Sequence, residues 1–199
     1  MTATAGSNES AHREVGDEEE EDDILESSSY RVAITGAPGV GKSTLVMSVL
    51  DRLNCNAGGV LTQERRIGGK RVGFELLDLK NGVRGELATL EGEGPSMGRY
   101  RINLPDLEEV GAKAIETAIK DSNIIVIDEV GPMELFSERF INAAERALAS
   151  DKPILLVVQA RSQHPLAQKI REKFKLITVT EKNRDSIVDE VASAFKSVV

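Results

Sequence analysis

Short apolar runs alternate along the chain with segments whose apolar residues recur every three or four positions. Residues 31–35, 124–127 and 154–158 are aliphatic and β-branched runs, as in strands buried on both faces of a parallel sheet. Residues 42–53 carry an apolar stripe at helical spacing, which predicts an amphipathic helix. We expect further strands over 58–62 and 176–180, and further helices over 106–121, 137–150, 165–174 and 183–199. The alternation predicts a three-layer α/β domain with a mostly parallel central sheet.

One stretch interrupts this alternation. Residues 67–72 read Ile-Gly-Gly-Lys-Arg-Val, which predicts a β-hairpin with a Gly-Gly turn. Another short strand is expected over 83–88, so we predict a small antiparallel insertion in the sheet. Residues 91–98 hold three glycines and a proline, and this loop is the best candidate for a mobile lid.

The acidity of the chain is concentrated at its N-terminus. The 199 residues have a net charge of −8, but residues 1–29 carry ten acidic side chains and one basic one. The remainder is therefore close to neutral and gives no electrostatic reason to expect nucleic-acid binding. We predict a disordered acidic tail over 1–29 and one domain over 30–199. A solubilising leader is the favoured interpretation of the tail, and contact with an unknown protein partner is the alternative.

Composition narrows the setting of the protein. Cys55 is the only cysteine, so no intrachain disulfide can form. No apolar run is long enough to cross a bilayer, and the N-terminus lacks the layout of a signal peptide. We therefore expect a cytoplasmic protein with no membrane segment.

The octapeptide at 36–43, Gly-Ala-Pro-Gly-Val-Gly-Lys-Ser, follows the first strand and opens the first helix. This pattern in this setting predicts a phosphate-binding loop whose backbone N–H groups surround a triphosphate. Lys42 is expected to reach the β- and γ-phosphates, and Ser43 to place its hydroxyl on Mg²⁺. The nucleotide-binding residues are predicted to be Gly36, Ala37, Pro38, Gly39, Val40, Gly41, Lys42, Ser43 and Thr44.

Two carboxylates complete the predicted site. Asp128 and Glu129 follow the apolar run 124–127, at the edge of the sheet where ligands bind in open α/β folds. We expect Asp128 to hold Mg²⁺ and Glu129 to orient or deprotonate an attacking water. Without the loop at 36–43, two solvated carboxylates opening a loop would be the better interpretation.

Other residues have less specific roles. The γ-phosphate charge calls for a further cation, and the candidates are Arg65, Arg66, Arg99, Arg101, Arg161 and Arg184. His164 is interpreted as a turn residue, and the small number of His and Cys residues argues against a zinc site. Glu134 either supports the site through a water or pairs with a basic residue on the surface.

The chain resembles the P-loop nucleoside-triphosphatase family that includes small thermophilic enzymes and the cancer-related nucleoside-triphosphatase. The resemblance runs from about Arg31 to Phe195 and is carried by five motifs, at 36–43, 58–62, 69–74, 128–136 and 180–184. It implies a RecA-like variant of the P-loop fold and Mg²⁺-dependent hydrolysis of ATP, GTP and other triphosphates with loose base selectivity. By position, Lys42, Ser43, Asp128 and Glu129 match the family's site. Residue 132 is Pro where Lys is common, so no role is carried onto Pro132.

Three functions are compatible with these motifs. The first is a nucleoside-triphosphate phosphohydrolase, because Glu129 beside Asp128 suits water activation. The second is a nucleotide or small-molecule kinase on the same fold, although the glycine- and acid-rich segment 91–98 lacks the arginines of a kinase lid. The third is a nucleotide-gated interaction module in which slow hydrolysis times a conformational switch.

Overall fold

The computed structural model describes residue 1 and residues 30–197, so the predicted acidic tail lies outside the described residues except at Met1. One nine-stranded sheet runs through the described domain in the order β5-β6-β4-β3-β2-β7-β8-β1-β9. Its strands are β1 Arg31–Gly36, β2 Ala57–Ile67, β3 Lys70–Asp78, β4 Arg84–Thr89, β5 Ser96–Met97, β6 Tyr100–Ile102, β7 Ile124–Val130, β8 Ile154–Val158 and β9 Lys175–Val179. All five strands expected in the parallel part are present.

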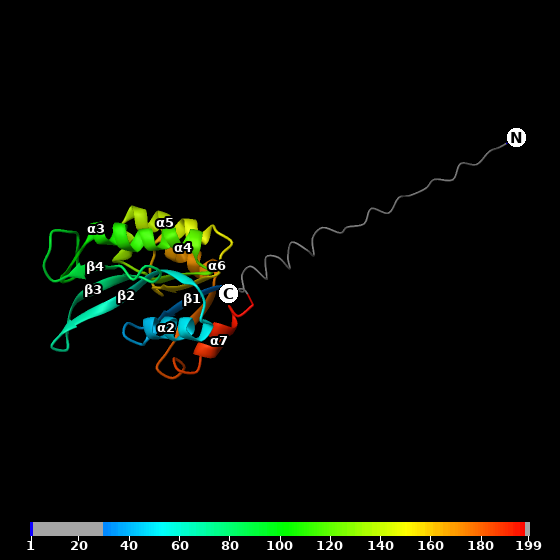
Figure 1. The fold of residues 1–199 in the computed structure, drawn as a ribbon, viewed down its shortest axis with the longest axis horizontal. Coiled ribbons are helices and arrows are strands. Elements are labelled where there is room, and N and C mark those ends of the chain that lie inside the picture. Colours follow the sequence, from blue (N-terminus) through cyan, green and yellow to red (C-terminus); the bar gives the residue numbers. More distant parts are fainter. Residues whose placement is uncertain (2–29, 198–199) are drawn as a thin grey trace.

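Helices cover both faces of this sheet, which confirms the three-layer α/β class (Figure 1). On one face lie α4 Lys113–Asp121, α5 Glu138–Leu148 and α6 Pro165–Lys173, and on the other lie α2 Lys42–Leu53 and α7 Val188–Ser193. Successive residues of β7 point to opposite faces: Ile125 packs in the core beneath α4 and α5, and Val126 packs in the core beneath α2. The continuous apolar runs in the sequence thus reflect strands buried from both sides.

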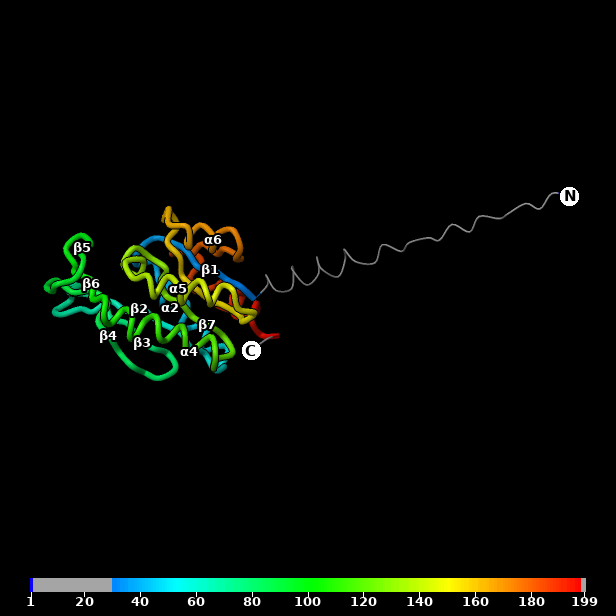
Figure 2. The backbone as a smooth tube through the Cα atoms, turned by 90° about the horizontal axis from the view of Figure 1, so that it is seen from above, coloured from blue at the N-terminus to red at the C-terminus, as the bar shows by residue number. Residues whose placement is uncertain are grey.

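The antiparallel part is larger than the small insertion expected. β2, β7, β8, β1 and β9 are parallel neighbours, whereas every pairing among β2, β3, β4, β6 and β5 is antiparallel. The turn at Gly68 and Gly69 joins β2 to β3 as predicted. These strands continue the same sheet to one side (Figure 2). The sheet is therefore mixed rather than mostly parallel, because the hairpin strands extend the edge at β2.

Two of the expected helices differ from their predicted form. The helix expected over 106–121 is present as three consecutive segments, α3 Leu104–Asp106, the π-helical η1 Leu107–Ala112, and α4. The helix expected over 183–199 is wrong in extent, since α7 covers only Val188–Ser193 and residues 198–199 are outside the described residues. Asn183 explains the late start: its side chain binds the backbone at residues 178 and 180 and holds a turn there. Among the described residues, no helix is both long and apolar enough to cross a membrane.

Candidate functional site

The loop between β1 and α2 has the backbone conformation that its sequence requires. Gly39 and Gly41 have φ angles of 76° and 106°, which residues with a Cβ atom rarely adopt. Helix α2 begins at Lys42, whose Nζ donates to the carbonyl oxygens of Gly36 and Ala37, each at 3.2 Å. The lysine ammonium therefore lies folded over the loop, at the N-terminus of a helix that favours anions. All nine residues predicted to bind nucleotide, 36–44, form this one segment.

The structure brings the second predicted element, Asp128, against the loop. Asp128 lies in β7 and is 1% exposed, and the Ser43 side chain is close enough to its carboxylate to influence its pKa. Burial raises this pKa to about 7, with a further increase from Glu129, while Ser43 and Lys42 oppose the shift. Its Oδ2 atom is buried without a hydrogen-bond partner in the described structure. A buried, unpartnered carboxylate oxygen is a costly group that a bound cation would satisfy.

Glu129 lies beside this pair in a distorted part of β7. Between Ile127 and Val130, β7 advances three residues while β8 advances two, so a bulge falls on Asp128 and Glu129. Burial raises the pKa of the Glu129 carboxyl, and the Lys42 ammonium opposes that shift. Bulges redirect side chains, and here Asp128 and Glu129 are both close enough to Lys42 to feel its charge.

A third carboxylate, Glu134, belongs to this cluster, which excludes the expected alternative of a surface ion pair. Glu134 is 4% exposed at the start of the short 3₁₀ helix η2 Glu134–Phe136. A Cβ built on Gly131 would lie 2.8 Å from Glu129 Oε1 and 3.1 Å from Glu134 Oε2, so the two carboxylates flank this glycine. Burial, then the charge of Glu129, raise the pKa of Glu134 to about 8. The sequence of residues 128–136 identified Glu134 as a candidate, but it did not predict that Glu134 is buried.

The oxygen donors present fit Mg²⁺ better than a softer metal. Within residues 30–197, no cluster of three His, Cys, Asp or Glu side chains is arranged to hold a metal ion. Mg²⁺ commonly uses one or two protein oxygens together with water and substrate phosphates. The Ser43 hydroxyl and the unpartnered Asp128 oxygen match that donor set.

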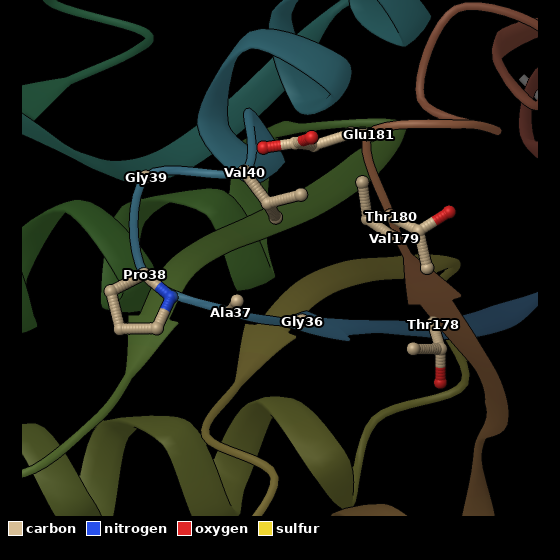
Figure 3. A pocket seen from close by; sticks show the side chains of 9 residues that line it. All are labelled: Gly36, Ala37, Pro38, Gly39, Val40, Thr178, Val179, Thr180 and Glu181. Atoms are coloured by element: carbon tan, nitrogen blue, oxygen red, sulfur yellow. The ribbon is translucent and has the colours of Figure 1, made fainter.

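A cavity of about 430 Å³ adjoins the phosphate loop (Figure 3). Loop residues 36–40 form one wall, and residues 178–181, at the end of β9 and beyond it, form the other. The walls meet closely: a Cβ on Gly36 would lie 2.6 Å from the Val179 carbonyl oxygen. The sequence contained no signal for this cavity, because its two walls are separated by more than 130 positions.

The structure separates the candidate arginines. Arg65 pairs with Glu75 and Glu86, and Arg66 pairs with Glu64, all on the antiparallel strands. The Arg99 guanidinium donates to the Arg71 carbonyl and to the Tyr100 hydroxyl. In contrast, the Arg184 side chain packs on the loop, with Cδ 3.6 Å from the position of a Cβ on Gly41.

Two remaining expectations concern His164 and the segment 91–98. The His164 ring caps α6, since Nδ1 accepts the Leu166 N–H at 3.2 Å, which supports its interpretation as a turn residue. The candidate lid 91–98 contains β5, the edge strand at the opposite end of the sheet from β9. The strand order therefore does not place segment 91–98 as a lid over the phosphate loop.

The chain is similar to known proteins over most of its length. A family model described as NTPase matches residues 31–192. Nucleoside-triphosphatase THEP1 of Methanosarcina acetivorans is 44% identical over 169 residues, which cover 83% of this chain and 96% of that protein. The Thermotoga maritima THEP1 is 39% identical over 169 residues, or 83% of this chain and 95% of the relative.

The fold is similar to that of two solved structures. The crystal structure of THEP1 from Aquifex aeolicus superimposes with a TM-score of 0.75 at 32% identity, covering 81% of this chain and 96% of that one. The solution structure of a human cancer-related nucleoside triphosphatase gives a TM-score of 0.71 at 31% identity, covering 85% and 98%. The overall fold of this chain is thus that of these two structures.

Proposed function

This chain belongs to the NTPase family and is a nucleoside-triphosphatase, and we propose that it hydrolyses ATP, GTP and other triphosphates with Mg²⁺ and loose base selectivity. One observation supports the proposal above the others: the buried Asp128 oxygen that has no partner lies on a carboxylate whose pKa is influenced by both Ser43 and Lys42 of the phosphate loop. A phosphate loop alone would support binding. The acidic pair beside it supports hydrolysis.

The proposed division of roles follows from position. Loop N–H groups and the Lys42 ammonium bind the β- and γ-phosphates, while Ser43 and Asp128 hold the metal. Mg²⁺, when bound, neutralises charge on the β- and γ-phosphate oxygens. The Glu129 carboxylate orients a water and takes its proton as the water oxygen bonds to the γ-phosphorus and the bond to the β-phosphate oxygen breaks. The raised pKa of Glu129 makes it a stronger base than an exposed glutamate.

Phosphate release with ATP, GTP, CTP and UTP, in Mg²⁺ and in EDTA, tests the reaction and its base selectivity. Lys42→Ala is expected to lose nucleotide binding and turnover together. Glu129→Gln is expected to keep Mg²⁺–nucleotide binding and to lose turnover by about 100-fold or more, as for removal of a general base. Glu172→Gln, the same substitution at an exposed position on α6, is the matched control. Full turnover by Glu129→Gln would refute the role of Glu129.

The kinase alternative is separated by the product. A kinase transfers the γ-phosphoryl group to an acceptor, so little inorganic phosphate accumulates when an acceptor is present. Phosphate release in stoichiometry with diphosphate, without any added acceptor, supports the hydrolase. Segment 91–98, which would have to serve as the lid of a kinase, contains the edge strand at the far end of the sheet from β9.

A further inference from the structure

The cavity beside the phosphate loop is too large for phosphates alone. Its volume of about 430 Å³ is in the range of sites that enclose small organic ligands. Five of its nine lining residues belong to the loop, so a ligand in the cavity also touches the phosphate-binding backbone. The loop and the cavity together therefore suit a ligand that has a phosphate end and an organic end.

The second wall of the cavity is fixed by the Asn183 side chain and by strand pairing. Asn183 Oδ1 accepts the Thr180 N–H at 2.7 Å, and its Nδ2 donates to the Thr178 carbonyl at 3.0 Å. Strand β9 in turn pairs with β1 as far as Gly36 and Val179. The wall is thus fixed to the same strand that carries the loop, and the width of the cavity is built into the sheet.

Arg184 lies at the rim of this cavity. Its backbone N–H donates to the Thr180 carbonyl at 3.1 Å, so the turn that Asn183 closes also directs Arg184. Its side chain packs on Gly41, the residue after Val40 of the cavity wall. The side chain is 47% exposed, and its ion pair with Asp185 is long, at 3.9 Å. The Arg184 side chain is therefore accessible to solvent beside Gly41, next to the loop residues that line the cavity.

The chemistry of these groups favours contact with the faces of a base over reading of its edge. Pro38 gives an apolar side chain to the lining, Val40 and Val179 border it from the core, and Thr178 and Thr180 carry hydroxyls suited to a sugar (Figure 3). Glu181 is the one ionisable side chain among the lining residues. A guanidinium plane stacks on any base, because every base has a π-face.

We propose that the nucleoside of the substrate occupies the cavity between residues 36–40 and 178–181, with Arg184 stacked on its base. The inference rests on the proposed nucleotide specificity, and it explains loose selectivity physically. Stacking holds the four bases similarly, and Asn183 acts as a positioning residue that keeps the wall and Arg184 in place.

Binding measurements test this inference without relying on turnover. The ligands are ADP, GDP, CDP, UDP and inorganic pyrophosphate, each titrated calorimetrically in Mg²⁺ into the full chain. Arg184→Ala is expected to raise the Kd of all four nucleotides about tenfold, which corresponds to about 1.4 kcal/mol, and to leave the Kd of pyrophosphate unchanged. Arg184→Lys keeps the charge but loses the plane, so it should recover little affinity.

Two further variants control the experiment. Lys182→Ala removes an exposed cation from the same turn and is expected to bind all five ligands as the unaltered chain does. Thr178→Phe adds bulk at a lining position on a strand, where an aromatic residue is well tolerated, and should weaken nucleotides but not pyrophosphate.

The outcomes are distinct. An equal loss for pyrophosphate and nucleotides in Arg184→Ala would place Arg184 on the phosphates and overturn the inference. Unchanged nucleotide binding in both Arg184→Ala and Thr178→Phe, or a loss confined to a single base, would overturn it as well. If the unaltered chain binds none of the nucleotides, the proposed function itself fails.

Discussion

Replacing the buried Glu134 by Gln is expected to stabilise the protein at neutral pH. Burial and the neighbouring Glu129 raise the pKa of this carboxyl to about 8, from an ordinary value of 4.5. The folded protein therefore keeps the Glu134 proton over a pH range in which the unfolded chain releases it. Glutamine has a similar shape and no proton to release.

The sign and size of this stabilisation follow from the linkage between proton binding and folding. A group whose pKa is higher in the folded state makes the free energy of unfolding fall as pH rises through this range. The loss is about 1.4 kcal/mol per pH unit, or about 3 kcal/mol between pH 4.5 and pH 7. The Glu134→Gln protein escapes this loss. It should exceed the unaltered chain in unfolding free energy by up to about 3 kcal/mol at pH 7, and by little near pH 4.5.

Urea denaturation in EDTA between pH 4.5 and pH 8 measures this difference. Asp128 titrates in both proteins, so its contribution largely cancels in the comparison. Glu172→Gln, the same substitution on the exposed surface of α6, is the matched control. A difference between Glu134→Gln and the unaltered chain that stays constant across this pH range would refute the reasoning.

Three further predictions concern the metal, a helix cap and a close backbone contact. Because the pKa of Asp128 is about 7, Mg²⁺ must displace a proton from this carboxyl below that pH. The Mg²⁺ affinity measured by calorimetry should therefore fall about tenfold for each unit by which the pH is lowered below 7. An affinity that stays constant from pH 5 to 7 would contradict this. Ser137→Ala removes the side chain that accepts the Phe140 N–H at 3.1 Å at the start of α5, and should lower the unfolding free energy by about 1 kcal/mol in urea. Gly59→Ala would drive a Cβ into the Val126 carbonyl of β7 and should lower the unfolding free energy by about 3 kcal/mol in the same assay. A much smaller decrease would show that β2 can move away from β7.

Local patterns in the sequence predicted much of the fold and the centre of the site. The loop 36–43 specifies its own backbone, because its glycines and the start of the following helix lie within eight neighbouring residues. Continuous apolar runs mark strands covered on both faces, and the hairpin turn at Gly68 and Gly69 is a local signal as well. The α/β class and the alternation of strands and helices therefore followed from periodicity alone.

Long-range placement was not predictable in the same way. The size of the antiparallel part depends on which strand edges remain free for pairing, and each strand's own sequence leaves that open. The same limit applies to the helix expected at 183–199, where side-chain hydrogen bonds of Asn183 to the end of β9 compete with helix formation.

The sequence by itself determined that this protein has a phosphate loop, a following helix, and an acidic pair directly after an apolar run. Only the tertiary structure decided that Asp128 lies near Ser43 and Lys42, that Glu134 is buried beside Glu129, and that residues 178–184 face the loop. The physical reason is that conformation is set by neighbours along the chain, whereas burial and proximity are set by sheet order. That order is the result of packing the whole domain.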